Sequence, residues 1–193
     1  VLFCDLRGFT PFASAAAPEE VVDLLGEYYR TVAQPLQDVK ATVGALQGDG
    51  IMAYFNDPVP CPDPAGTALR VALAVRSDLV RLTQEWDDKG FHLGFGIGIA
   101  FGYATLGTIG LDTRGDYRAL GPVVNLASRL CDEAKNGEIL IDQRTYGATR
   151  ELVGDVAVRK LELKGYADLV SARVVNGIAQ QRDAGIAERV SSG

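Results

Sequence analysis

Two short apolar runs joined through an Asp-Gly pair constrain the fold of this chain more than any other feature. The runs are residues 41–46 and 51–55, and Gln47-Gly48-Asp49-Gly50 separates them. An Asp-Gly pair between apolar runs is typical of a tight turn between antiparallel strands. We therefore predict a β-hairpin with Asp49 at its tip, around which the neighbouring elements must pack.

A strand and a helix are expected before the hairpin. Val1-Leu2-Phe3-Cys4 is an apolar run that ends at Asp5, as is typical of a buried strand. Pro18-Glu19-Glu20 marks the first turn of a helix, because proline is tolerated there and acidic side chains complement the helix dipole. Apolar residues then recur at helical spacing as far as Val32, and we expect Pro35 to bend or weaken this helix.

A second helix and several strands are expected after the hairpin. Asp63 and Pro64 are typical of a helix cap and a first helical residue. The pattern then predicts, in order, a long strand over residues 93–105, a polar excursion over 112–116, a helix from Pro122, a strand over 138–141, a short helix over 143–149 and a closing hairpin over 156–175.

This order of elements predicts an α+β fold. Strand, helix, hairpin, helix and strand form the ferredoxin-like split βαβ (βαββαβ) plan, an antiparallel-rich sheet with helices packed on one face. The closing hairpin adds extra C-terminal strands. We expect one domain over residues 1–176 and a frayed tail over 177–193.

Composition narrows the class of protein. The chain has 193 residues, 47% of them hydrophobic and 23% charged, as in ordinary globular domains. A net charge of −6 argues against nucleic-acid binding, and the apolar runs are too short for a membrane segment. Three scattered cysteines favour a reduced, cytoplasmic setting. The chain begins at Val1 rather than Met, so we expect it to be part of a longer protein.

Two aspartates are candidate metal ligands. Asp5 ends the first strand and Asp49 lies at the hairpin tip, and the split plan places these strands side by side. Two carboxylates together with substrate phosphates are the usual ligands of magnesium. An aspartate in Gly-Asp-Gly is, taken alone, more often a turn residue. Its pairing with Asp5, and the backbone N–H groups of Gly8-Phe9-Thr10, favour a phosphate-handling metal site.

Three further polar residues have two readings each. Asn125 and Arg129 lie four residues apart and share one face of the predicted third helix. They fit a solvated polar stripe, or an amide that holds a ribose beside a guanidinium that stabilises charge at phosphorus. Lys164 fits either a tight turn or a phosphate clamp, and spacing alone favours neither.

Several motifs of this chain occur together, in this order, in one known family. They are Leu2-Phe3-Cys4-Asp5-Leu6-Arg7-Gly8-Phe9-Thr10, Gly48-Asp49-Gly50-Ile51-Met52-Ala53, Gly96-Ile97-Gly98-Ile99, Val124-Asn125-Leu126-Ala127-Ser128-Arg129-Leu130, Gly137-Glu138-Ile139-Leu140-Ile141 and Leu163-Lys164-Gly165. In this combination the chain resembles class III adenylate/guanylate cyclases over about residues 1–175.

The resemblance implies a homodimer with two composite sites that make a cyclic nucleotide and pyrophosphate from a nucleoside triphosphate. It implies two Mg²⁺ or Mn²⁺ ions per site and an attached sensory or regulatory domain. By position, the resemblance implies that Asp5, Asp49 and the Leu6 carbonyl bind the metal ions. It implies that the Phe9 and Thr10 amides and Lys164 bind the phosphates. The catalytic residues would be Asn125 and Arg129 of the partner subunit.

Two positions depart from the adenylate cyclase pattern. Ala45 stands where such enzymes usually carry a lysine, and Arg118 where they carry Asp or Thr. Arginine only donates hydrogen bonds, so it suits a carbonyl or ring nitrogen of the base rather than an amino group. ATP is the default substrate on family frequency alone, and the two departures leave GTP or a pyrimidine nucleotide open. A dimerising regulatory module with a weak site is the alternative; a diguanylate cyclase is disfavoured because its Gly-Gly-acid-acid-Phe hairpin is missing from the sequence.

Overall fold

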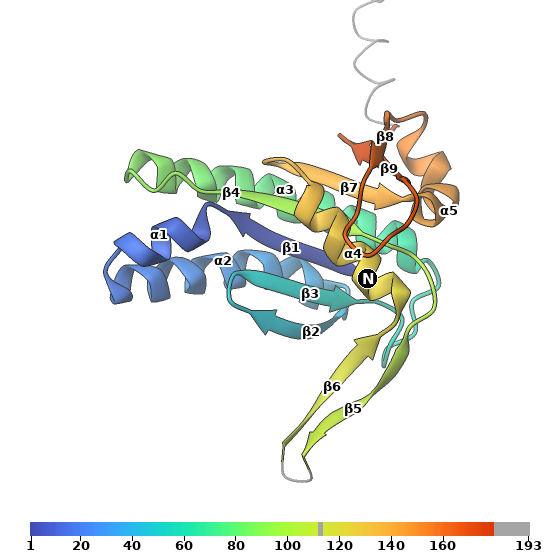
Figure 1. Cartoon of the computed structure of the whole chain (residues 1–193), viewed down its shortest axis with the longest axis horizontal. Coiled ribbons are helices and arrows are strands. Elements are labelled where there is room, and N and C mark those ends of the chain that lie inside the picture. The colour runs from blue at the N-terminus through green and yellow to red at the C-terminus, as the bar shows by residue number, and fades with distance from the viewer. Residues whose placement is uncertain (112–113, 180–193) are drawn as a thin grey trace, which may run out of the picture.

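The predicted hairpin forms one edge of a seven-stranded sheet in the computed structural model, which describes residues 1–111 and 114–179 (Figure 1). Strand β2 (Thr42–Gln47) pairs antiparallel with β3 (Gly50–Tyr54). Gln47 lies opposite Gly50, which leaves a two-residue turn. Gly48 has φ +61° there, a left-handed conformation that glycine adopts at little cost, and Asp49 follows at the tip.

The sheet confirms the split βαβ plan with extra C-terminal strands. Its order is β2-β3-β1-β4-β7-β9-β8, and every neighbouring pair is antiparallel except β4 with β7. The remaining strands of this sheet are β1 (Leu2–Arg7), β4 (Gly94–Ile99), β7 (Glu138–Asp142), β8 (Val158–Leu161) and β9 (Val170–Val175). Because β1 and β3 are neighbours, Asp5 and Asp49 reach the same part of the sheet.

Helices cover both faces of the sheet, so the expectation of a single covered face is wrong. Helices α2 (Pro18–Asp38), α3 (Pro64–Asp88) and α5 (Gln143–Val153) pack with the main core on one face. Helix α4 (Pro122–Glu133) lies on the other, in front of the sheet in Figure 1. Side chains alternate between the faces of a strand, and the glycines of β4 give α4 room to approach.

The approach of α4 is closest at Gly98. A Cβ atom at this position would fall on the backbone of α4, 2.8 Å from Cys131 Cα and closer still to Cys131 N and Ala127 O. The neighbouring strand β7 contributes the buried Leu140 to the same interface, together with Leu130 of α4. Helix α4 is thereby seated directly over β4, next to the strand that carries Asp5.

Three local expectations differ from the structure. A short helix, α1 (Phe9–Ala15), follows β1 and was not predicted. Helix α2 continues through Pro35 to Asp38. The long strand over 93–105 is wrong, because β4 pairs with β1 only as far as Ile99, opposite Leu2, where β1 begins. The chain then continues into β5 (Thr105–Leu111), which pairs with β6 (Arg114–Leu120) in a separate hairpin that projects from the body (Figure 1).

Two further findings concern possible membrane segments and the C-terminal end of the described chain. In residues 1–111 and 114–179 no helix is both long and apolar enough to cross a membrane. Most of the predicted tail, residues 180–193, lies outside the described residues, and the domain boundary at 176 stays a prediction.

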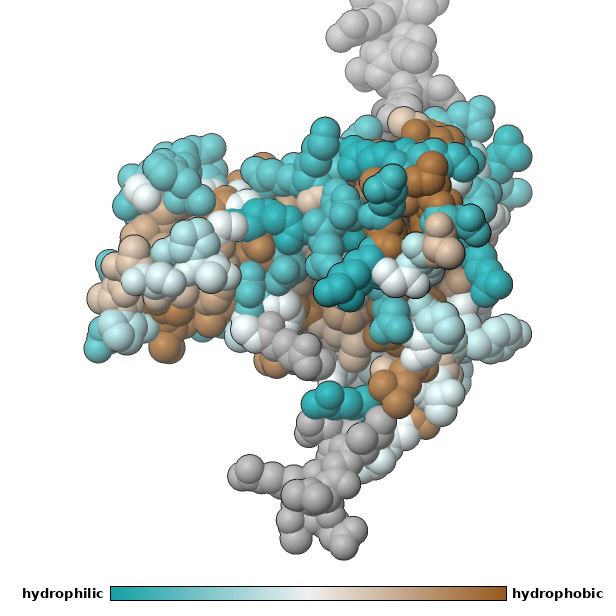
Figure 2. All heavy atoms as spheres, viewed as in Figure 1, coloured by the Kyte–Doolittle hydropathy of each residue, from teal (hydrophilic) through white to brown (hydrophobic). Residues whose placement is uncertain are grey.

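Figure 2 shows this face of the molecule as mainly polar over α4, with apolar residues reaching the surface around the connection from β8 to β9. Tyr166 and Leu169 are exposed in that connection.

Candidate active site

Asp5 and Asp49 line one pocket on the face covered by α4. The pocket has a volume of about 390 Å³, and its walls include Phe3 and Met52 from the sheet and Ser128 from the helix. The carboxylates meet there because β1 and β3 run antiparallel with Cys4 opposite Ile51. On the same side of this pair, Asp5 is the next residue of β1, and Asp49 lies two residues before Ile51, in the turn that precedes β3. The expected convergence of the two carboxylates is thus present within the chain.

The electrostatics of the pocket fit a divalent cation. Burial and the charge of Asp49, in that order, raise the pKa of Asp5 from 3.8 to about 6, and Arg7 opposes the rise. Two hard oxygen donors that repel one another in a partly closed pocket are a favourable environment for magnesium or manganese, whose charge relieves the repulsion. Among the described residues, no group of three or more His, Cys, Asp and Glu side chains gathers to hold a metal ion alone. Substrate oxygens would have to complete any coordination shell here.

The predicted phosphate ligands Phe9 and Thr10 lie immediately beyond the strand of Asp5. They lie in the first turn of α1, after Gly8, which adopts a left-handed conformation at φ +80°. Backbone N–H groups in the first turn of a helix have no intrahelical acceptor and so can bind an anion. The Leu6 carbonyl, a predicted metal ligand, lies between these amides and Asp5 in the sequence and is 3.5 Å from Arg7 Nη1.

The predicted catalytic residues Asn125 and Arg129 and the predicted phosphate ligand Lys164 do not line this pocket. Asn125 is exposed on α4, and Arg129 is half-exposed and donates to Asp132 Oδ2 at 2.9 Å. Lys164 is exposed in the turn that follows β8. Asp132 itself lies at the pocket with Asp5 and Asp49. The pocket of this chain therefore brings the carboxylates together, whereas Asn125, Arg129 and Lys164 are not among its lining residues.

One of the two predicted base-selecting positions is placed at the pocket. Arg118, on β6, is half-buried and lines the same cavity as Asp5 and Asp49. Ala45 pairs with Met52 in the register of β2 with β3, but its side chain lies outside the part of the chain that the structure describes.

Two residues that sequence reasoning missed hold the carboxylate-bearing segments. The Tyr29 hydroxyl, from α2, donates to the carbonyl of Gly48 and so fastens the turn that carries Asp49. Arg7 forms an ion pair with Asp5 at 3.5 Å. Tyr29 carries no sequence signal beyond its place among the apolar and aromatic residues of the predicted helix after Pro18. Arg7 carried a usable signal, because it lies two residues after Asp5 and so on the same face of the strand.

Fold and pocket together define a class III nucleotidyl cyclase domain. The chain belongs to the adenylate and guanylate cyclase catalytic domain family, whose sequence model matches residues 1–173.

Adenylate and guanylate cyclases are both among its relatives. Adenylate cyclase 1 of Rhizobium meliloti is 35% identical over 132 residues, which are 67% of this chain and 20% of that protein. The adenylyl cyclase CyaB of P. aeruginosa is 32% identical with a TM-score of 0.82, covering 91% of this chain and 92% of that one. The guanylyl cyclase Cya2 is also 32% identical with a TM-score of 0.86, covering 93% and 91%. This chain spans 20% to 27% of the length of the curated relatives it matches.

Proposed function

We propose that this chain is an active nucleotidyl cyclase that converts a nucleoside triphosphate into a 3′,5′-cyclic monophosphate and pyrophosphate. The observation that carries the proposal is the meeting of Asp5 and Asp49 in one pocket of a cyclase-family domain. A site that had lost its function would be expected to lose these carboxylates first, because their desolvation and mutual repulsion are costly without a cation.

The chemistry is an in-line displacement at phosphorus. The ribose 3′-oxygen forms a bond to the α-phosphorus, the bond from that phosphorus to the α,β-bridging oxygen breaks, and the hydroxyl proton is released. Two divalent cations, held by Asp5, Asp49 and the Leu6 carbonyl, would supply the positive charge that activates the 3′-oxygen and neutralises the triphosphate. The Phe9 and Thr10 amides bind phosphate oxygens.

The remaining groups come from a second copy of the chain. Asn125 and Arg129 are exposed or half-exposed on α4 and do not line the carboxylate pocket of their own subunit, which supports a role in the partner's site. There the Asn125 amide orients the ribose and the Arg129 guanidinium stabilises charge at phosphorus. Lys164 binds the terminal phosphates. Two composite sites per homodimer follow from this division.

The identity of the base rests on Ala45 and Arg118. ATP is the default because adenylate cyclases are frequent in the family and among the relatives. Arg118 favours a second candidate, a base with an acceptor on its edge such as guanine, because arginine carries only donors. The guanylyl cyclase Cya2 is as similar to the chain as the adenylyl cyclase CyaB, so identity to these relatives does not choose between the two.

Product analysis tests the proposal. The purified chain is incubated separately with ATP, GTP, CTP and UTP in Mg²⁺ or Mn²⁺, and cyclic product and pyrophosphate are quantified by chromatography. We expect equimolar cyclic product and pyrophosphate from at least one nucleotide, and loss of both in Asp5→Ala and Asp49→Ala. Asp78→Ala, a surface aspartate paired with Arg81, is the matched control and keeps activity. Product from none of the four nucleotides would support the regulatory-module alternative instead.

A further inference from the structure

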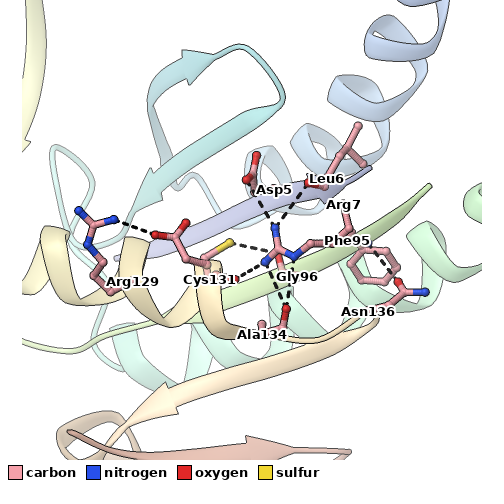
Figure 3. A network of polar contacts seen from close by, with 10 residues as sticks. Asp5, Leu6, Arg7, Phe95, Gly96, Arg129, Cys131, Ala134 and Asn136 are labelled. Atoms are coloured by element: carbon pink, nitrogen blue, oxygen red, sulfur yellow. Dashed lines mark hydrogen bonds and ion pairs between the residues drawn. The ribbon is translucent and has the colours of Figure 1, made fainter. Parts of the chain in front are cut away.

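Arg7 joins the strand of Asp5 to the end of helix α4. Its guanidinium donates to the Cys131 carbonyl through Nη2 and to the Ala134 carbonyl through Nε and Nη2, both at 3.3 Å. On its other side, Nη1 lies 3.5 Å from both Asp5 Oδ2 and the Leu6 carbonyl. Figure 3 shows this guanidinium between the Asp5 carboxylate and the last turn of α4. One side chain thus touches two predicted metal ligands and a helix terminus.

The contact with Arg7 provides hydrogen-bond donors and positive charge at the C-terminal end of α4. The last carbonyls of an α-helix lack intrahelical donors and carry the negative end of the helix dipole. Helix α4 has no basic residue in its own last turn. The Ala134 N–H donates to the Leu130 and Cys131 carbonyls. Arg7 adds further donors, to the Cys131 and Ala134 carbonyls, and a positive charge, from a strand more than 120 residues away in the sequence.

The fold leaves space for the guanidinium at Gly96. A Cβ atom at this position would fall on Arg7 Nη2, 3.0 Å from Arg7 Cζ and 3.1 Å from Ala134 Cβ. Asp5 and Arg7 lie on the same face of β1, and Gly96 lies opposite Asp5 on β4. The absence of a side chain at Gly96 is therefore what allows Arg7 to reach the helix.

We propose that Arg7 is a positioning residue, which clamps the C-terminal end of α4 to β1 and so fixes the position from which α4 presents Asn125 and Arg129 to the partner's site. The inference rests on the proposed cyclase function. It does not give Arg7 a contact with substrate. The forked guanidinium is what matters, since it can reach two helix carbonyls and the Asp5 carboxylate together.

Three variants distinguish the effect of the positive charge of Arg7 from the effect of its contact with the end of α4. Arg7→Lys keeps the charge but loses the fork, and Gly96→Ala keeps Arg7 but displaces its guanidinium. Arg7→Gln loses both charge and fork. If Arg7 clamps the helix, all three lower kcat about tenfold with nucleotide KM within about twofold of wild type, because misplaced groups act in the transition state. Only Arg7→Gln also binds Mn²⁺ more tightly, by about fivefold, since a cation beside Asp5 is gone.

The matched control is Arg76. This partly buried arginine also donates to two backbone carbonyls, Val175 at 3.0 Å and Asn176 at 2.9 Å, but from α3 to the end of β9. Arg76→Gln removes a comparable contact away from the pocket. It is expected to cost similar thermal stability and to leave kcat and Mn²⁺ binding unchanged.

Two measurements without nucleotide keep the test independent of turnover. Mn²⁺ binding is followed by electron paramagnetic resonance, and amide hydrogen exchange is followed over residues 128–134. The clamp predicts exchange at the end of α4 that is about fivefold faster in all three variants and unchanged in Arg76→Gln. Wild-type kcat and wild-type exchange in Arg7→Lys and Gly96→Ala would overturn the inference. So would an equal loss of kcat in Arg76→Gln. A wild-type chain that cyclises no nucleotide would instead refute the proposed function, while the exchange and Mn²⁺ data still decide the clamp.

Discussion

Replacing Asp49 with asparagine is expected to stabilise the metal-free chain while abolishing its turnover. Asparagine keeps the size of the side chain and its turn preference but removes the negative charge. That charge is the second cause, after burial, of the raised pKa of Asp5. The folded chain therefore carries a repulsion between two carboxylates that the variant no longer contains.

The magnitude follows from the pKa of Asp5. A carboxyl with a pKa of about 6 in the fold and 3.8 when unfolded costs about 3 kcal/mol once it is ionised. Asp5 is one-third exposed, so solvent screening reduces this to about 1–2 kcal/mol. Burial is the larger cause, so Asp49 accounts for less than half of this, about 1 kcal/mol at most. For a domain of this size Asp49→Asn should raise Tm by about 1–4 °C.

The pH dependence has a definite sign. A carboxyl whose pKa is raised by folding contributes stability below its unfolded pKa of 3.8, and that contribution is lost as the pH rises through about 6. The difference in Tm between Asp49→Asn and wild type should therefore be small near pH 4 and reach its full value above about pH 7.

Differential scanning calorimetry of the metal-free chain, with and without Mn²⁺, measures both effects. Mn²⁺ should raise the Tm of wild type far more than that of Asp49→Asn, because the variant has one carboxylate in the pocket. Asp78→Asn is the control and should behave as wild type. A variant that is less stable than wild type above pH 7, or that gains as much stability from Mn²⁺, would refute the reasoning.

Three further outcomes are expected. Tyr29→Phe removes the hydroxyl that donates to the Gly48 carbonyl. It should raise the Mn²⁺ concentration for half-maximal activity severalfold and lower the stability by about 1 kcal/mol. The control Tyr146→Phe loses a hydrogen bond of 3.3 Å to Asp155 and should leave the Mn²⁺ dependence unchanged. Gly98→Ala should cost about 2–3 kcal/mol in urea unfolding because its Cβ meets the backbone of α4, and Gly107→Ala, whose Cβ meets nothing within 4 Å, should cost far less. Turnover at limiting Mn²⁺ should fall as the pH drops through about 6, because protons compete with the cation for Asp5, and saturating Mn²⁺ should move that fall to lower pH.

The sequence predicts those features that depend on local periodicity. The Asp-Gly turn, the strand before Asp5 and the helix from Pro64 each carry a short-range signal, and Asp63 Oδ1 does accept from the Gly66 amide at 2.9 Å. The convergence of Asp5 and Asp49 follows from the order of these elements alone, because the split plan leaves little choice of neighbouring strands.

The sequence does not predict features that depend on contacts between residues far apart in the chain. Strand β4 ends where β1 begins, and no local pattern over residues 93–105 marks that point. The role of Arg7 depends on carbonyls 124 and 127 residues away, so the sequence shows only a charge beside an aspartate. The position of α4 on the second face depends on the close approach at Gly98, which resembles an ordinary strand glycine until the helix is placed over it.

Subunit complementation tests the central claim, a two-metal cyclase with shared sites, most directly. Asp49→Ala and Arg129→Ala each inactivate both sites of a homodimer but damage different halves of the composite site. Random exchange in an equal mixture makes about half of the dimers mixed, each with one intact site, so activity should recover to about a quarter of wild type. A mixture that forms dimers yet stays as inactive as its two components would contradict the account.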